Sequence, residues 1–202
     1  MKPLLMATHN AHKLREMTRI LEPLSFSVIG EQDLKTPLPP VAETGTTFEE
    51  NALLKARSGC RATGLITVAD DSGLCVDALN GAPGVFSARF AGEPTDSRKN
   101  NEKLLRLLRD VPAEKRTARF VCAVACVFPD GHEFTVRGEC EGSILPKPCG
   151  ENGFGYDPLF ACTAGCFGTM TDCQKDAVSH RGKALERFAA EIQKYGKEET
   201  EC

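Results

Sequence analysis

Two adjacent acidic residues, Asp70 and Asp71, end an apolar run and precede Ser72. Carboxylates at such a position are costly unless water or a cation stabilises them. Successive side chains of an extended chain point to opposite faces, so we expect only one of the two acids to lead the chemistry of the site. Asp71, beside the turn expected at Ser72-Gly73, is the better placed of the two to face a cleft at the strand end. Carboxylate oxygens suit Mg²⁺, which takes one or two protein carboxylates plus substrate phosphates. Glu43 is the candidate second ligand and Asp70 the alternative, whereas a plain strand end at the surface would also explain the pair.

A polar segment near the N-terminus could bind phosphate. Where a strand end feeds a helix start, backbone N–H groups and the positive end of the helix dipole face the ligand. Thr8 and Asn10 could add donors and Lys13 a charge, although the segment lacks the Walker pattern. Simple capping of the helix by Asn10 is the alternative. The segment comprises Thr8, His9, Asn10, Ala11, His12 and Lys13.

Three later features could also contact a ligand. Lys55 shares a helix face with Asn51, and Lys175 precedes the Ser179-His180-Arg181-Gly182-Lys183 segment, whose histidine and arginine could donate hydrogen bonds. A loop with two aromatic residues between glycines could press a ring onto a planar base, which is worth about 1–3 kcal/mol. Solvated charges and a tight turn with core aromatics are the alternatives. The loop residues are Phe154, Gly155, Tyr156 and Asp157.

The elements that must position these residues follow from hydrophobic spacing and turn signals. A capping box at Thr47–Glu50 predicts a helix to about Ala62, and Asp130-Gly131 predicts a hairpin. Strands are expected at 2–8, 26–29, 65–70, 117–128 and 133–144, with 75–79 a strand or turn, and further helices at 14–21, 97–108 and from 180 onward. We predict a mixed α/β fold, one domain over residues 1–202, a turn at 80–84, a loop at 150–158 and a frayed tail at 197–202.

Composition limits the class of protein. The chain has 202 residues, 41% of them hydrophobic, and 25 basic against 28 acidic residues, a net charge of −3. This excludes global disorder and argues against many phosphate contacts to nucleic acid. With no apolar run long enough for a membrane or a signal peptide, we expect a soluble cytoplasmic protein without nucleic-acid or membrane partners. The ten cysteines are interpreted as incidental or core thiols, with Cys122 and Cys126 on one face of a strand. A zinc site at Cys162, Cys166, Cys173 and His180 is the weaker alternative.

Together, in this order, the motifs resemble the inosine triphosphate pyrophosphatase family, also called Ham1-like or non-standard purine NTP pyrophosphatases, in its bacterial-type branch. The resemblance implies an elongated, twisted central mixed sheet flanked by helices, with two lobes around a cleft. The chain departs from the family at His9, where glycine is usual, and in its many cysteines. The motifs are Thr8–Lys13, Thr47–Ala56, Ala69–Leu74, Gly81–Arg89, Phe154–Pro158 and Ser179–Gly182.

The resemblance implies a homodimer that uses Mg²⁺ to hydrolyse ITP, dITP and XTP to the monophosphate and pyrophosphate. We hypothesise that Glu43 and Asp71 hold the metal and that Asp71 deprotonates the attacking water. The substrate-binding set is Thr8–Lys13, Lys55 and Lys175 for the phosphates, with Ser72 beside them, and Phe154, Gly155, Tyr156, Asp157, His180 and Arg181 for the base. In this hypothesis Phe154 or Tyr156 stacks on the base, Asp157 binds one edge of its ring, and His180 and Arg181 donate hydrogen bonds to the purine O6. The alternatives are a Maf-like pyrophosphatase acting on modified pyrimidine nucleotides or dTTP, and a purine-nucleotide sensor without catalysis.

Overall fold

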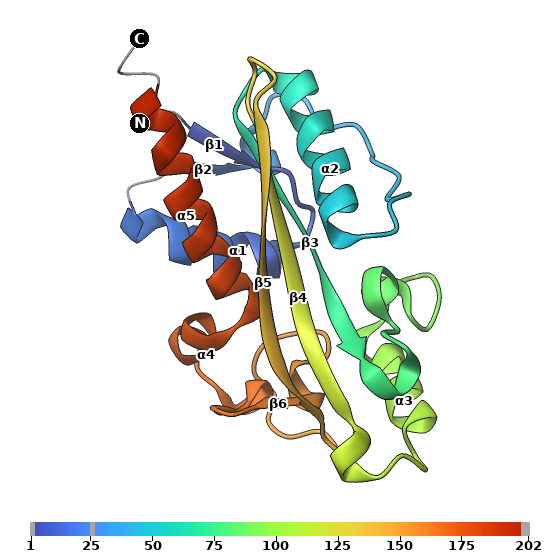
Figure 1. Cartoon of the computed structure of the whole chain (residues 1–202). Coiled ribbons are helices and arrows are strands. Elements are labelled where there is room, and N and C mark those ends of the chain that lie inside the picture. The colour runs from blue at the N-terminus through green and yellow to red at the C-terminus, as the bar shows by residue number, and fades with distance from the viewer. Residues whose placement is uncertain (1–2, 25–26, 199–202) are drawn as a thin grey trace. The chain divides into compact units, whose positions relative to one another are not determined.

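The computed structural model describes residues 3–24 and 27–198 (Figure 1). The strand positions predicted at Lys2 and Phe26 lie outside the described residues, as do residues 199–202 of the tail predicted at 197–202, whereas residues 197 and 198 end the last helix. The helices are α1 (Ala11–Leu21), α2 (Phe48–Thr63), α3 (Ser97–Leu107), α4 (Asp172–Val178) and α5 (His180–Glu198). The strands are β1 (Pro3–Met6), β2 (Ser27–Gly30), β3 (Thr67–Val76), β4 (Thr117–Val127), β5 (Glu133–Ile144), β6 (Phe160–Cys162) and β7 (Gly165–Cys166).

The strands form one mixed sheet in the order β2-β1-β3-β4-β5-β6-β7. β1 runs parallel to both β2 and β3, whereas β6 runs antiparallel to β5 and β7. β4 and β5 are neighbours in this order and are joined by a tight turn with Gly131 at a φ of 93°. The predicted mixed α/β fold and the predicted hairpin are therefore confirmed.

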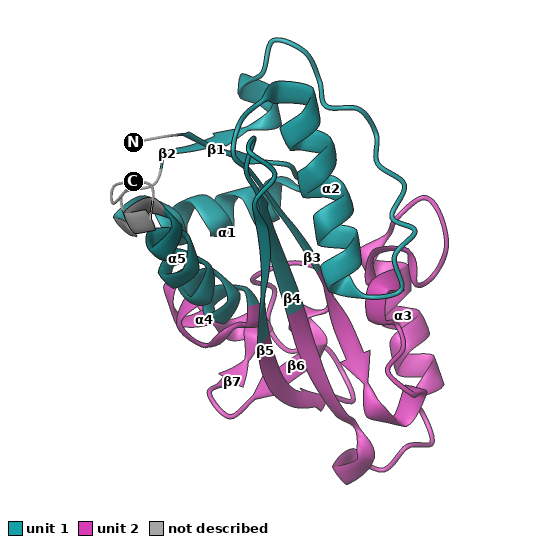
Figure 2. Ribbon diagram, turned by 45° about the horizontal axis from the view of Figure 1, so that its top comes forward, with its two compact units in different colours: residues 1–71, 122–138, 181–202 teal, residues 72–121, 139–180 magenta. Residues whose placement is uncertain are grey.

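The chain divides into two compact units (Figure 2). Unit 1 holds residues 1–71, 122–138 and 181–202, and unit 2 holds residues 72–121 and 139–180. Each unit has its own hydrophobic cluster. The single domain expected over the whole chain stays a prediction.

In unit 1, helices cover both faces of the strands. Met17 of α1 packs in one cluster with Phe188 of α5 and with Val68 of β3. Gly59 of α2 approaches Thr67, the residue before Val68 in β3. A Cβ added at Gly59 would lie 2.8 Å from Thr67 Cγ2. Because neighbouring side chains of a strand point to opposite faces, α2 covers the face away from α1 and α5.

The helix ends that flank the candidate site follow local rules. The Thr47 side chain accepts from the backbone N–H of Glu50, whose carboxylate returns the bond, so the predicted capping box is confirmed. Gly64 ends α2 at a φ of 69°, a conformation that glycine adopts without strain. The Asn10 side chain accepts from two backbone N–H groups at the start of α1. Both helices are thus fixed at the ends nearest the chemical residues.

In unit 2, the cluster is rich in phenylalanine. The Phe120 ring meets Phe160 edge-on at 4.8 Å and stacks on Phe167 at 5.9 Å. Leu104 of α3 and Tyr156 of the glycine-rich loop belong to the same cluster. This packing anchors the C-terminal end of the loop that carries the predicted base-binding residues.

The structure corrects two features of the predicted element map. The turn expected at Ser72-Gly73 is absent, because β3 continues through it from Thr67 to Val76. The segment 75–79, predicted as a strand or turn, contains the end of β3 and then a single helical turn at Asp77–Leu79. The acids stay in the strand because cations face both of them and an amide also donates a hydrogen bond to Asp71. Helix α4 and the short strands β6 and β7 lie between the predicted loop at 150–158 and the predicted helix from 180, where no element was predicted. No helix among the described residues is both long and apolar enough to cross a membrane.

Candidate active site

One candidate site in unit 1 centres on Asp71 in β3. Asn51 Nδ2 donates to Asp71 Oδ2 at 3.1 Å, and Lys55 Nζ lies 3.7 Å from Asp71 Oδ1. Lys55 also donates to Glu43 Oε1 at 2.7 Å. The structure therefore brings together Glu43, Lys55 and Asp71, and it places Asn51 and Lys55 on one face of α2 as predicted.

Asn51 connects this cluster to the loop before α2. Its side chain is fully buried, and its Oδ1 accepts from the backbone N–H of Gly45 at 2.8 Å while its amide donates to Asp71. Sequence analysis used Asn51 only to mark a helix face. A polar amide at an inward position of an amphipathic helix is the signal that identifies it, because buried polar groups need partners.

The electrostatics of the cluster suit a proton acceptor. Burial raises the pKa of Asp71 and the negative charge of Glu43 raises it further, against the lowering effect of Lys55 and Lys13, so the net pKa lies above its usual value. Burial alone would lower the pKa of Lys55, but the surrounding carboxylates outweigh it and raise that pKa. The lysine therefore stays charged between the two acids.

The donor set fits a magnesium ion. Glu43 and Asp71 approach closely enough for each to disfavour the other's charge, a repulsion that a divalent cation would relieve. Magnesium takes one or two protein carboxylates and completes its shell with water and phosphate oxygens. Within the described residues, no group of three or more His, Cys, Asp and Glu side chains is arranged to hold a metal. The two carboxylates match an ion that relies on its substrate for further ligands.

Asp70 points to the opposite face of β3 and is 1% exposed. Lys13 Nζ lies 2.9 Å and Arg181 Nη2 3.2 Å from its Oδ2. Burial would raise the pKa of Asp70, but Lys13, Arg181 and Lys55 hold it well below its usual range. Asp70 is therefore a fixed counter-ion of Lys13 and Arg181. This favours Asp71 as the acid that would bind a metal ion.

Glu16 is a further acid on this face. Its carboxylate accepts from Arg181 Nη1, and both side chains are almost fully buried. Sequence analysis missed Glu16. Its position three residues after Lys13 on an inward face of α1 was the available signal.

The predicted phosphate segment is largely occupied by internal bonds. Thr8 Oγ1 accepts from the Asn10 N–H at 3.2 Å, and Asn10 Oδ1 accepts from the N–H groups of His12 and Lys13 at 3.0 and 3.3 Å. The exposed His9 lies 2.6 Å from Glu31, and His12 accepts from Arg15 at 2.8 Å. Helix capping by Asn10, the simpler interpretation, is therefore present. Ala11 is the first residue of α1, and Ser72 follows Asp71 in β3.

A second candidate site, in unit 2, joins Lys175 to the aromatic loop. Lys175 Nζ lies 2.7 Å from Asp157 Oδ2 and 4.7 Å from the centre of the Phe154 ring. The Phe154 N–H donates to the same carboxylate at 2.8 Å. Gly153, at a φ of 76°, leaves space for it, because a Cβ there would lie 2.1 Å from Asp157 Oδ2. The structure thus places Lys175 with the predicted base-binding residues, whereas the sequence analysis grouped it with the phosphate-binding lysines.

The remaining loop residues divide into core and accessible groups. Tyr156 is 5% exposed and its hydroxyl donates to the Ser87 carbonyl at 2.9 Å, so its ring belongs to the core. Phe154 is half-buried and is the better candidate for stacking. The His180 ring stacks on Phe120 at 4.7 Å. Asn101, which sequence analysis missed, donates to the Gly155 carbonyl at 3.0 Å and fixes the loop.

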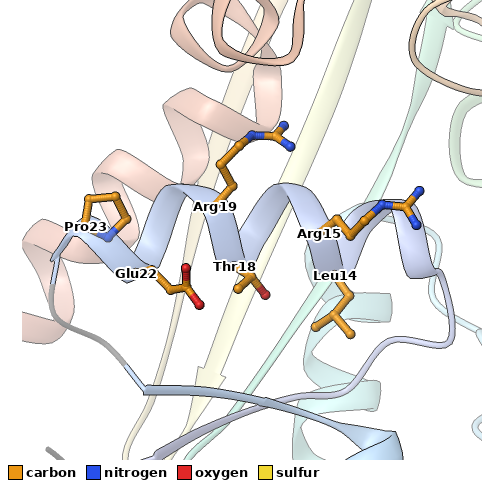
Figure 3. A pocket seen from close by; sticks show the side chains of 6 residues that line it. All are labelled: Leu14, Arg15, Thr18, Arg19, Glu22 and Pro23. Atoms are coloured by element: carbon orange, nitrogen blue, oxygen red, sulfur yellow. The ribbon is translucent and has the colours of Figure 1, made fainter.

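Unit 1 also has a pocket along α1. It is lined by side chains of α1 and of the turn that follows it (Figure 3), and none belongs to the predicted set. The lining residues are Leu14, Arg15, Thr18, Arg19, Glu22 and Pro23.

A mixed α/β fold with buried carboxylates and lysines at one strand is suited to a hydrolase of phosphate compounds. The sequence matches the Ham1 family over residues 4–191, and the chain belongs to this family. A curated dITP/XTP pyrophosphatase from Nocardia farcinica is 54% identical over 190 residues, covering 92% of each chain.

Solved structures agree. A HAM1 protein from Coxiella burnetii is 37% identical, covers 96% of this chain and 100% of its own, and has a TM-score of 0.86. A nucleoside-triphosphatase / dITP/XTP pyrophosphatase from Mycobacterium abscessus is 48% identical, covers 92% of this chain and 98% of its own, and has a TM-score of 0.75. The predicted family is therefore confirmed.

Proposed function

We propose that this protein hydrolyses the non-standard purine nucleotides ITP, dITP and XTP to the monophosphate and pyrophosphate. The relatives named dITP/XTP pyrophosphatases support this activity. The structural observation that carries it is the Glu43–Lys55–Asp71–Asn51 cluster, in which a buried acid of raised pKa lies beside a lysine and a second acid. Such a group can activate water next to a phosphate chain.

Asp71 is the proposed general base. Its carboxylate, which accepts from Asn51 at Oδ2 and faces Lys55 at Oδ1, takes the proton of the attacking water. The raised pKa makes Asp71 a stronger base than an exposed aspartate. Water adds to the α-phosphorus, the bond between that phosphorus and the bridging oxygen breaks, and pyrophosphate leaves. Glu43 and Asp71 would hold Mg²⁺, which would neutralise negative charge that develops on the phosphates.

Lys55 and Lys13, with the segment from Thr8, are the proposed phosphate contacts. For the base we propose Phe154 as the stacking ring, Asp157 and Lys175 at one ring edge, and His180 and Arg181 as donors to the purine O6. Arg181 has five N–H groups, so it can serve Glu16, Asp70 and a ligand oxygen together. A site built to donate to O6 rejects adenine, which presents a donor at that position.

The first test measures pyrophosphate release from ITP, GTP, ATP and dTTP, each with Mg²⁺ and with EDTA. We expect rapid release from ITP in Mg²⁺, little from ATP, and none in EDTA. Preferential use of dTTP would instead indicate a Maf-like enzyme, and binding of ITP without release would indicate a nucleotide sensor.

The second test replaces the proposed base. Asp71→Asn keeps the shape of the side chain and should lower kcat for ITP by about 10²–10⁴-fold. Glu102→Gln on the exposed face of α3 is the control, because its Arg98 partner is solvent-exposed and the change should leave kcat intact. An Asp71→Asn protein that is folded and turns over ITP at the wild-type rate would rule out Asp71 as the base.

We also propose that the protein acts as a homodimer in the cytoplasm, where nucleoside triphosphates are consumed. Its partners are then purine nucleoside triphosphates and a second copy of itself, with no nucleic acid or membrane. Sedimentation equilibrium across a range of protein concentrations tests the dimer. A single species of monomer mass would contradict it.

A further inference from the structure

Two thiols of unit 2, Cys149 and Cys166, lie side by side. Cys166 is 8% exposed and Cys149 is exposed. Cys166 Sγ is 3.1 Å from the Cys149 carbonyl oxygen, and the Cys149 thiol is near enough to raise the pKa of Cys166 further. The pair therefore combines one accessible and one buried thiol.

The backbones around the two cysteines are packed against each other. The Cys149 N–H donates to the Pro158 carbonyl at 2.8 Å, and Cys166 Sγ lies 3.8 Å from that same oxygen. A Cβ at Gly168 would lie 2.3 Å from the Cys149 carbonyl oxygen, and one at Gly150 would lie 1.9 Å from the Gly168 carbonyl oxygen. Only glycines at these two positions allow so close an approach, which holds the thiols together.

We propose that Cys149 and Cys166 form a thiol–disulfide site that hydrogen peroxide oxidises. In the first step the Cys149 sulfur displaces water from one peroxide molecule and becomes a sulfenic acid. In the second step the Cys166 thiol attacks that sulfur, the S–S bond forms, and a second water leaves with the Cys166 proton. Two thiols are oxidised, one peroxide is reduced, and two waters are released.

The order of the steps follows from exposure. Peroxide reaches the exposed Cys149 directly, whereas burial raises the pKa of the Cys166 thiol and shields it. Cys166 is therefore suited to resolve the sulfenic acid. Cys126, in β4 of unit 1, serves as a comparison. It is buried and burial raises the pKa of its thiol, so we expect it to be unreactive toward peroxide.

The bond would constrain the aromatic loop. Phe154 and Asp157 lie between the two cysteines in sequence, and Cys166 Sγ is already 3.8 Å from the Asp157 carbonyl. A disulfide would close this stretch into a covalent ring. The site needs no nucleotide and no metal, so its test is independent of the proposed hydrolysis.

The test maps disulfides in the full chain after treatment with a small molar excess of hydrogen peroxide. Free thiols are blocked with iodoacetamide, and the protein is cut with trypsin and with a protease that cleaves before aspartate. Cleavage before Asp157 places Cys149 and Cys166 on separate peptides. We expect these two peptides to be linked, with fragmentation locating the bond at the two sulfurs, and to separate on reduction with dithiothreitol.

Variants sharpen the result. Cys149→Ser and Cys166→Ser should each abolish the linked peptides. The control is Cys162→Ser, which removes the other cysteine of the peptide that carries Cys166 and leaves both proposed sulfurs in place, so the link should be retained. Oxidation of Cys149 to sulfinic acid without a link in the wild-type protein would overturn the proposal. So would a link that fragmentation assigns to Cys140 or Cys162.

Discussion

Replacing Asp70 by asparagine should strongly destabilise unit 1. Asp70 is 1% exposed and faces Lys13 at 2.9 Å and Arg181 at 3.2 Å. The substitution preserves the shape of the side chain but leaves two buried or half-buried cations short of a counter-charge. Removing one partner of a buried ion pair typically costs about 3–5 kcal/mol, and the Arg181 contact to Glu16 places the expected loss near the lower end, at about 3 kcal/mol.

The loss should depend on pH in a defined direction. The cations hold the pKa of folded Asp70 well below its usual range, whereas the unfolded value is about 3.9. A carboxyl of depressed pKa contributes its full stabilisation well above the unfolded pKa and loses it as the pH falls below that value toward the folded pKa. At pH 3.5 the wild-type advantage over Asp70→Asn should therefore shrink by about 0.7 kcal/mol.

Urea denaturation at pH 7 and pH 3.5, followed by circular dichroism and by fluorescence of an added dye, measures both quantities. Glu102→Gln is the control, since its exposed pair with Arg98 should contribute only about 0.3–0.5 kcal/mol. A pH 7 difference below about 1 kcal/mol would refute the counter-ion role that the geometry assigns to Asp70. So would a difference that does not decrease at pH 3.5.

Three further changes test the packing of the two units. Lys175→Met should lower the free energy of unfolding by about 3–5 kcal/mol in thermal denaturation, because it removes the cation that faces the buried Asp157 carboxylate. Adding Asp157→Leu should recover part of this loss. Gly59→Val should lower the free energy of unfolding in urea by about 1–3 kcal/mol, because its Cβ would meet Thr67 at 2.8 Å. Tyr156→Phe should cost about 1 kcal/mol in the same assay through its lost hydroxyl bond. Full wild-type stability in any of these variants would contradict the corresponding contact.

Short-range rules predicted the local framework of the site well. The capping box at Thr47 placed the start of α2, and helical spacing put Asn51 and Lys55 on one face. Strand alternation likewise separated Asp70 from Asp71, which the structure places on opposite faces with different partners. These features depend on residues within a few positions of each other, so they are readable from the sequence.

Long-range pairing was not readable in the same way. The Glu16–Arg181 contact joins residues 165 positions apart, and nothing local in either segment specifies it. The continuation of β3 through two aspartates depends on Lys13 and Arg181 arriving from other elements, so the sequence favoured a turn. The contact between Lys175 and Asp157 was not readable for the same reason, since Asp157 lies in a separate loop.

The charge of the cluster in unit 1 also changes the account of how phosphate is attracted. The lysines were predicted to have that role, but in the structure each cation is paired with acids. Three cations face four carboxylates, so with all groups ionised the cluster carries one excess negative charge and would repel a triphosphate. The members are Lys13, Lys55 and Arg181 with Glu16, Glu43, Asp70 and Asp71. A divalent cation reverses the sign of the sum. Substrate binding, and not only turnover, should therefore weaken in EDTA. Equilibrium binding of an ITP analogue with a non-hydrolysable α–β bridge to the wild-type protein, with Mg²⁺ and with EDTA, measures this without hydrolysis.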